Sequence, residues 1–82
     1  MTSSQDFHRK IDKLDEDIIR LLNERVTLCQ ETEDEDPEAL GSDYQIDTLS
    51  HYEGAADEKG WSPVLMNRLC KAIVDLCKHA GE

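Results

Sequence analysis

The sequence predicts an all-α fold in which a long, a short and a medium helix follow one another within a single domain, residues 1–82. Apolar residues recur every three or four positions through the first third of the chain and again near its end, which is the spacing of amphipathic helices. Serine, proline and glycine stand where such helices would begin and end. No stretch alternates apolar and polar residues as a half-buried strand does.

The first helix is predicted to span roughly residues 4–32, with Ser3 and Asp6 in the spacing of a capping box. Counted in sevens, one stripe of this helix is apolar except at a single position; it consists of Ile11, Leu14, Ile18, Leu21, Arg25 and Leu28. A guanidinium keeps its charge in a protein, and its burial without an anion is strongly unfavourable. We therefore expect something negative to meet Arg25.

An acidic loop is predicted over residues 33–42. Five acidic residues between 31 and 36 lie where the helix dipole favours cations, and Pro37 cannot continue the hydrogen-bond ladder. The first helix should therefore fray between Thr32 and Asp36. Asp36-Pro37-Glu38 is typical of one further helical turn, which would end at Gly41. The same acidic stretch lacks the glycine and the final glutamate of a calcium loop, so a solvated surface segment is expected there.

The second and third helices are predicted over residues 43–55 and 63–80. Ser42-x-x-Gln45 has the spacing of a capping box, and Gly54 indicates an end for the short helix. Ser62-Pro63 is a start signal, because serine caps helices and proline suits the first helical position. Gly81 follows the apolar pattern of the third helix and should end it.

The length of the first helix predicts a homodimer. A helix of some 28 residues is about 40 Å long, which exceeds what the two shorter helices can cover. A chain of 82 residues also buries only a modest share of its surface by itself. Pairing the long helices of two copies through the stripe from Ile11 to Leu28 would cover the exposed apolar side chains.

Charge and cysteine content bear on partners and location. A net charge of -10 disfavours nucleic acid and anionic lipid, and no run is apolar enough to span a membrane. The residues MTSSQDFHRK lack the apolar segment of a secretory signal, so we expect a cytoplasmic protein. Cys29, Cys70 and Cys77 lie in apolar helical stretches without metal-ligand spacing, so we expect reduced core cysteines, no metal and no cofactor.

The segment HRKIDKLDEDIIRLLNERVTL resembles the first-helix signature of the all-helical chorismate mutases. The matching residues are Ile11, Asp12, Leu14, Asp15, Ile18, Leu21, Leu22 and Arg25. The order of long, short and third helix is also that of this family. The resemblance implies an intertwined homodimer that converts chorismate to prephenate without a cofactor. It also implies that Arg25 reaches across the dimer to a carboxylate of the substrate.

Most other catalytic positions of the family differ here. On an alignment through Ile11, the resemblance assigns substrate-binding positions to His8, next to Arg9, and to Cys77. The family's arginine, lysine, arginine-glutamate pair, serine and glutamine become His8, Asp36, Thr48-Leu49, Cys77 and Gly81. Residues 26–58 contain no lysine or arginine. Losing one donor at a developing negative charge typically costs about 100-fold in rate, so we expect weak or absent mutase activity unless Lys59, Lys71 or Lys78 compensates.

Several interpretations therefore stay open. The domain is a chorismate mutase with Arg25 as the carboxylate clamp, assisted by His8 or Arg9, or it is a non-catalytic module that binds an anion or dimerises on the same fold. A lyase that removes pyruvate from isochorismate is a third possibility. Arg25 could instead pack its stem in the dimer seam while its head pairs with Glu24 or Asp17 of the other chain, or with solvent. The remaining residues are expected to be structural: Asp12 and Asp15 in ion pairs, His51 and His79 at the surface, Trp61 anchoring its loop, and Arg9 and His8 solvated if they do not bind an anion.

Overall fold

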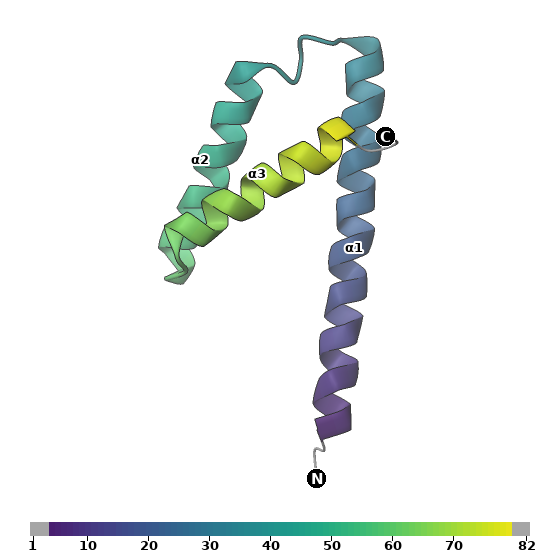
Figure 1. Cartoon of the computed structure of the whole chain (residues 1–82), viewed down its shortest axis with the longest axis vertical. Helices are drawn as coiled ribbons and strands as arrows, with labels where there is room; N and C mark the ends of the chain where they lie inside the picture. The colour runs from purple at the N-terminus through teal and green to yellow at the C-terminus, as the bar shows by residue number, and fades with distance from the viewer. Residues whose placement is uncertain (1–3, 80–82) are drawn as a thin grey trace.

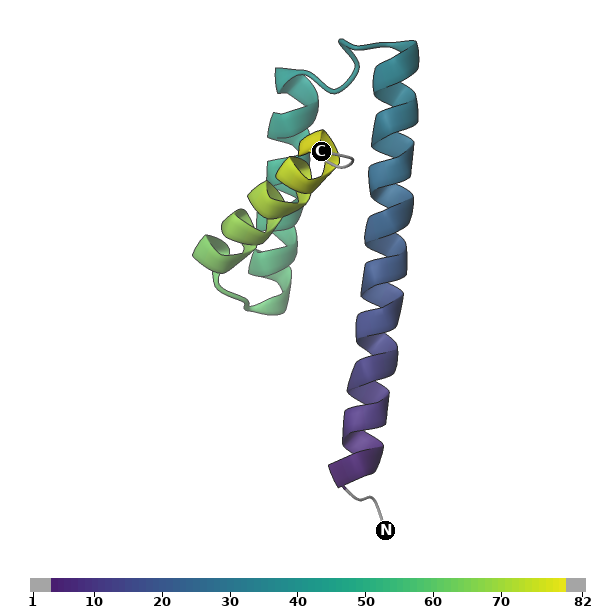
Figure 2. The same cartoon turned by 45° about the vertical axis from the view of Figure 1, so that its right-hand side comes forward.

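The computed structural model describes residues 4–79, which form three α-helices and no strand: α1 (Ser4–Glu35), α2 (Ser42–Lys59) and α3 (Pro63–His79). α2 and α3 form a hairpin, and α3 packs against both α2 and α1 (Figure 1). The turned view in Figure 2 shows that α1 extends well past the α2–α3 hairpin at its N-terminal end. The predicted all-α, three-helix class is confirmed.

α1 is longer than predicted, because its hydrogen-bond ladder continues through the acidic segment. The amide of Asp36 donates to the carbonyl of Thr32 at 2.7 Å, and the Thr32 hydroxyl donates to the carbonyl of Leu28 at 2.8 Å. The expected fraying between Thr32 and Asp36 is therefore wrong. An unfavourable charge near a helix end costs only about 0.3–1 kcal/mol, which these backbone bonds outweigh.

The acidic loop is shorter than predicted and holds the expected turn. Asp36 caps this turn, since its side-chain Oδ1 accepts from the amide of Glu38 at 3.2 Å. The amide of Ala39 donates to the carbonyl of Asp36 at 3.0 Å, and the amide of Gly41 donates to the carbonyl of Glu38 at 3.2 Å. These contacts bring the chain from the end of α1 to the start of α2 within a few residues.

α2 departs from prediction at both ends. Gly41 is its N-cap and forms no side-chain cap, so Ser42 is the first helical residue rather than the capping one. The helix passes through Gly54 and ends at Gly60, whose φ of 72° is left-handed and favours glycine. The amide of Trp61 donates to the carbonyl of Ala56 at 2.9 Å and completes this end. A single glycine inside a helix costs only about 1 kcal/mol, so Gly54 does not stop α2.

α3 begins as predicted. The Ser62 hydroxyl accepts from the amide of Leu65 at 3.3 Å, and Pro63 is the first helical residue. The last described residue of α3 is His79. The predicted end at residues 80–81 and the capping serine at position 3 lie outside the described residues. None of the three described helices combines the length and low charge needed to cross a membrane.

The core of the single chain is small. Five apolar residues of the described part are buried: Cys29, Ala56, Cys70, Ile73 and Cys77. The radius of gyration is 15.7 Å, whereas a compact chain of this length would have about 12 Å. Side chains of the apolar stripe on α1 are each 53–63% exposed, namely Phe7, Ile11, Leu14, Ile18, Leu21 and Leu28. The isolated chain thus leaves much of its apolar surface uncovered.

Candidate functional site

Arg25 lies where the three helices meet. Its Nη2 donates to the hydroxyl of Tyr44 on α2 at 2.5 Å, and its Nη1 lies 2.9 Å from Sγ of Cys77 on α3. The same Nη1 lies 3.6 Å from Sγ of Cys29, one turn further along α1. The guanidinium carbon also lies 5.9 Å from the centre of the Tyr44 ring. One half-buried arginine therefore links all three helices through uncharged partners.

No carboxylate neutralises Arg25 within residues 4–79. The ion pairs of α1 lie on its exposed side, where Lys13 pairs with Asp17 at 3.1 Å and Arg20 pairs with Glu24 at 3.3 Å. The carboxylates expected to meet Arg25 from another copy are thus engaged with other cations of their own chain. Among the described residues, no ion pair compensates the positive charge of Arg25.

Burial keeps the partners of Arg25 uncharged. It raises the pKa of the Tyr44 hydroxyl and of the Cys77 thiol above their ordinary values. Burial acts to lower the pKa of Arg25, but in the alkaline range where arginine titrates the ionised forms of Tyr44, Cys77 and Cys29 attract the guanidinium, and the pKa of Arg25 is raised. At neutral pH the junction is therefore a fixed cation among neutral groups. A protonated thiol is a poor nucleophile, so the arrangement suits anion binding better than covalent chemistry.

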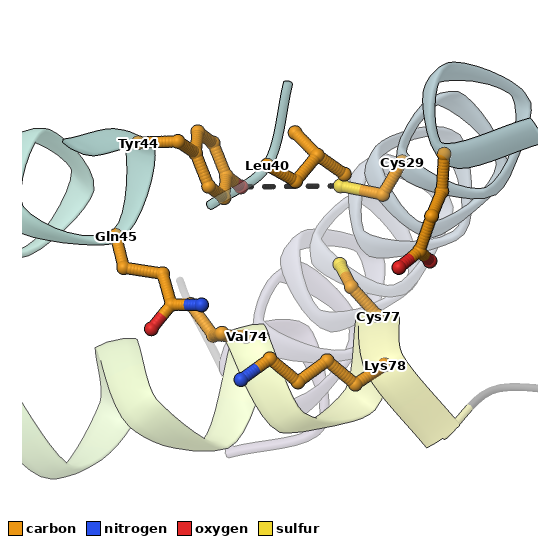
Figure 3. A pocket seen from close by; sticks show the side chains of 8 residues that line it. Cys29, Leu40, Tyr44, Gln45, Val74, Cys77 and Lys78 are labelled. Carbon is orange, nitrogen blue, oxygen red and sulfur yellow. Dashed lines mark hydrogen bonds between the residues drawn. The ribbon is translucent and has the colours of Figure 1, made fainter. Parts of the chain in front are cut away.

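Two hollows meet at this junction and share Cys29, Leu40 and Tyr44. The first, of about 240 Å³, is also lined by Arg25, Leu28 and Thr32. The second, of about 30 Å³, is completed by residues of all three helices, namely Glu33, Gln45, Val74, Cys77 and Lys78. Figure 3 labels most of the side chains that line it. Sites for small organic ligands usually measure about 300–1,000 Å³. Each hollow alone is smaller than such a site.

The predicted site residues are only partly brought together. Cys77 contacts Arg25 directly. His8 and Arg9 lie on exposed turns near the start of α1, and about 25 Å of helix separates His8 from Arg25. Within one chain they cannot share a ligand with Arg25. The hydrogen bonds of the Arg25 guanidinium to Cys29, Cys77 and Tyr44 lie within its own chain, and its reach across a dimer stays a prediction.

The three lysines considered as replacements lie in different places. Nζ of Lys59 lies 5.8 Å from the centre of the Trp61 ring, at the turn between α2 and α3. Lys71 lines a neighbouring hollow between α2 and α3. Lys78 lines the hollow that contains Cys29, Tyr44 and Cys77. Only Lys78 of these three borders the junction around Arg25.

The structure also locates other residues that the sequence singled out. Within the described chain, Asp12 and Asp15 form none of the ion pairs; Asp17 and Glu24 do so instead. Trp61 secures its loop through its backbone, while its side chain is 55% exposed. Among residues 4–79, the histidine, cysteine, aspartate and glutamate side chains form no group of three or more that could hold a metal ion.

Sequence reasoning missed two members of the junction, Tyr44 and Gln45. Both lie in the first turn of α2. Cys29 could have been placed, since it lies four residues after Arg25 and therefore on the same helix face.

No protein-family model, curated protein or solved structure matches the chain. The resemblance to the chorismate mutases therefore rests on the first-helix motif and on the order of the helices.

Proposed function

We propose that this chain forms a homodimer of the chorismate mutase type and binds a dicarboxylate such as chorismate, with Arg25 as the carboxylate contact. The observation that carries this proposal is a half-buried guanidinium whose hydrogen bonds all go to uncharged groups. A carboxylate adds direct charge–charge attraction to its hydrogen bonds with a guanidinium, which the uncharged Tyr44 and Cys77 do not. A carboxylate would therefore compete well with Tyr44 and Cys77 for Arg25.

The exposed stripe of α1 supports self-association, because two antiparallel copies can cover part of each other's apolar side chains. With a two-fold axis between Asp17 and Ile18, Phe7 of one copy faces Leu28 of the other, and Leu14 faces Leu21. All four of these side chains are more than half exposed in the single chain, and a partner in this register would cover them. A core of five buried residues is too small for an independent domain, and a second copy would enlarge it.

The same register would complete the anion site. It sets the partner's His8 opposite Thr27, within about one helical turn of Arg25. The partner's His8 and the partner's Arg9 would then add donors and walls to hollows that are too small in one chain. This is how residues far apart along α1 would serve one ligand.

Turnover of chorismate is expected to be slow or absent. The rearrangement develops negative charge on the ether oxygen and is accelerated by fixed cations and donors. The segment from Val26 to Glu58 supplies no lysine or arginine. Asp36, at the position of the family's lysine, caps the turn between α1 and α2. Each missing donor would cost about 3 kcal/mol of transition-state stabilisation.

A non-catalytic anion-binding module on the same dimer is the second candidate. The observation that favours it is the neutral state of Tyr44 and Cys77, which can hold an anion in place but supply no charge to a transition state. Removal of pyruvate from isochorismate would need a similar set of cations, and its products distinguish it from the rearrangement.

The test combines turnover and binding. Purified protein at high concentration and low salt is incubated with chorismate or isochorismate, and prephenate, pyruvate and aromatic acids are measured. Arg25→Gln removes the charge of the site, while Arg20→Gln is the matched control on the exposed side of α1. Turnover or binding that is lost only in Arg25→Gln supports the proposal. Equal behaviour of the two variants, with unchanged helix content, contradicts it.

A further inference from the structure

We propose that Cys29 and Cys77 are a redox-sensitive pair, which hydrogen peroxide converts to a disulfide that fixes α1 to α3. This inference does not depend on the proposed function, because it concerns only the two thiols and their surroundings. The three cysteines of the chain are free thiols in this structure. They also make up three of the five buried apolar residues in the described part of the chain, so their chemistry bears directly on the core.

The packing of α1 against α3 brings the two thiols together. Sγ of Cys29 on α1 and Sγ of Cys77 on α3 lie 3.6 Å and 2.9 Å from the same Nη1 of Arg25. In Figure 3 the side chain of Cys77 points toward that of Cys29. The two thiols also interact, since the Cys29 thiol adds to the effect of burial in raising the pKa of Cys77. Side chains that approach in this way are the ones that a disulfide can join.

Cys70 is buried as well, but it cannot pair with Cys77. It lies seven residues earlier on α3, which corresponds to about 10 Å of helix. The Cα atoms of a disulfide lie no more than about 7 Å apart. Cys70 instead lines a neighbouring hollow between α2 and α3. The chain therefore carries its own control for the chemistry of a buried thiol.

The space beside the pair admits a small oxidant. Cys29 and Cys77 both line the hollow of about 30 Å³, which has room for about one or two water-sized molecules. Hydrogen peroxide is of this size, whereas a bulky disulfide such as that of glutathione is not. The oxidant that the structure favours is therefore hydrogen peroxide.

The reaction takes two steps. The Cys77 thiolate attacks one oxygen of hydrogen peroxide, the O–O bond breaks, and a sulfenic acid forms on Cys77. The hydroxide that leaves takes up the proton lost by the thiol and becomes water. The Cys29 thiol then attacks the sulfenic sulfur, the S–OH bond breaks, and the disulfide forms with release of a second water. The two thiols thereby lose two electrons and two protons, which reduce the peroxide to water.

Arg25 is placed to assist the first step. Its Nη1 lies 2.9 Å from Sγ of Cys77, and a neighbouring positive charge stabilises a thiolate. Burial nevertheless raises the pKa of Cys77 and keeps the thiol mostly protonated at neutral pH. We therefore expect the pair to react more slowly than an exposed thiol and to respond to sustained rather than brief exposure to peroxide.

The experiment treats the folded, reduced protein with hydrogen peroxide, blocks the remaining thiols with maleimide and maps the unreduced tryptic peptides by mass spectrometry. Trypsin cleaves after lysine and arginine, so the three cysteines fall in separate peptides, residues 26–59, 69–71 and 72–78. We expect one disulfide within a single chain, between peptides 26–59 and 72–78, which dithiothreitol reverses. Because it joins α1 to α3 across the whole of α2, it should raise the melting temperature by about 10 °C or more.

The variants and the unfolded chain separate this pairing from ordinary thiol oxidation. Cys70→Ser is the matched control and should form the same disulfide as the unmodified protein. In Cys29→Ser, oxidation of Cys77 should stop at the sulfenic acid, which dimedone labels. In urea, Cys70 and Cys77 should pair instead, because the loop between them is the shortest to close.

The remaining outcomes would overturn the inference. These are a disulfide of the folded protein that involves Cys70 or joins two chains, and the same pairing in urea as in the folded protein. Oxidation of Cys77 to the sulfinic acid while Cys29 stays reduced would also overturn it. So would three thiols that survive in the folded protein under conditions that oxidise the unfolded chain. None of these results depends on whether Arg25 binds a carboxylate.

Discussion

Ile18→Asp should break the dimer, because Ile18 lies beside the proposed two-fold axis and is 54% exposed in the single chain. One substitution removes two side chains from the interface, and burying the exposed half of each isoleucine is worth about 1 kcal/mol. Two carboxylates close to each other at the axis add repulsion of about 1 kcal/mol or more. A total near 3 kcal/mol corresponds to about a 100-fold rise in the dimer dissociation constant.

Sedimentation equilibrium over a concentration series measures this constant. Ile46→Asp is the matched control, since Ile46 is 62% exposed on α2 and lies outside the α1 stripe; it should leave the constant within about threefold of that of the unmodified protein. Helix content by circular dichroism is followed in parallel, because a monomer with so small a core should unfold on dilution. An unmodified protein that is a folded monomer at micromolar concentration would refute the reasoning, as would an Ile18→Asp variant that dimerises normally.

Two further predictions concern stability. Gly60→Ala should lower the free energy of unfolding by about 1 kcal/mol, because an L-residue is strained at a φ of 72°. Gly54→Ala should raise it by a similar amount, since a methyl group there meets nothing within 4 Å. Thermal melts that shift the melting temperature of both variants in the same direction would contradict this. Burial raises the pKa of the Cys70 and Cys77 thiols in the folded protein. As pH rises, these thiols therefore lose their protons at a lower pH in the unfolded chain than in the folded one. The free energy of unfolding should fall as pH rises above the ordinary thiol pKa. Urea unfolding between pH 7.5 and 9.5 measures this slope, which Cys70→Ala should reduce; stability that rises with pH would contradict it.

Much of the fold could be predicted because local signals and the apolar pattern agree. Ser62 and Pro63 stand where α3 begins, and their capping geometry follows from residue type alone. The ends of the helices were harder to predict, since each end depends on small free-energy contributions of opposite sign. Gly54 and the acidic run before Pro37 both resemble signals for the end of a helix. The helical hydrogen bonds nevertheless continue through Gly54 in α2, and through the acidic run as far as Glu35 in α1. α2 ends at Gly60, which adopts a left-handed conformation, whereas Gly54 lies inside the helix.

The candidate site could be predicted only at its centre. Arg25 stands out because a charge interrupts an apolar stripe, which is visible in the sequence. Its partners Tyr44 and Cys77 lie on other helices, and their approach depends on how α2 and α3 pack, which periodicity does not encode. Lys78 was one of three lysines that sequence reasoning could not separate. Packing separates them, because only Lys78 borders the hollow beside Arg25.

The measurement that tests the central claim most directly is chorismate binding to the unmodified protein and to Arg25→Gln at low and at raised salt. The account predicts binding that weakens as salt rises, because the carboxylate of the ligand is held by the charge of Arg25. It also predicts that Arg25→Gln loses this binding while keeping its helix content and its dimer. Binding that is independent of both salt and Arg25 would contradict the account, and so would the absence of any binding to the intact dimer.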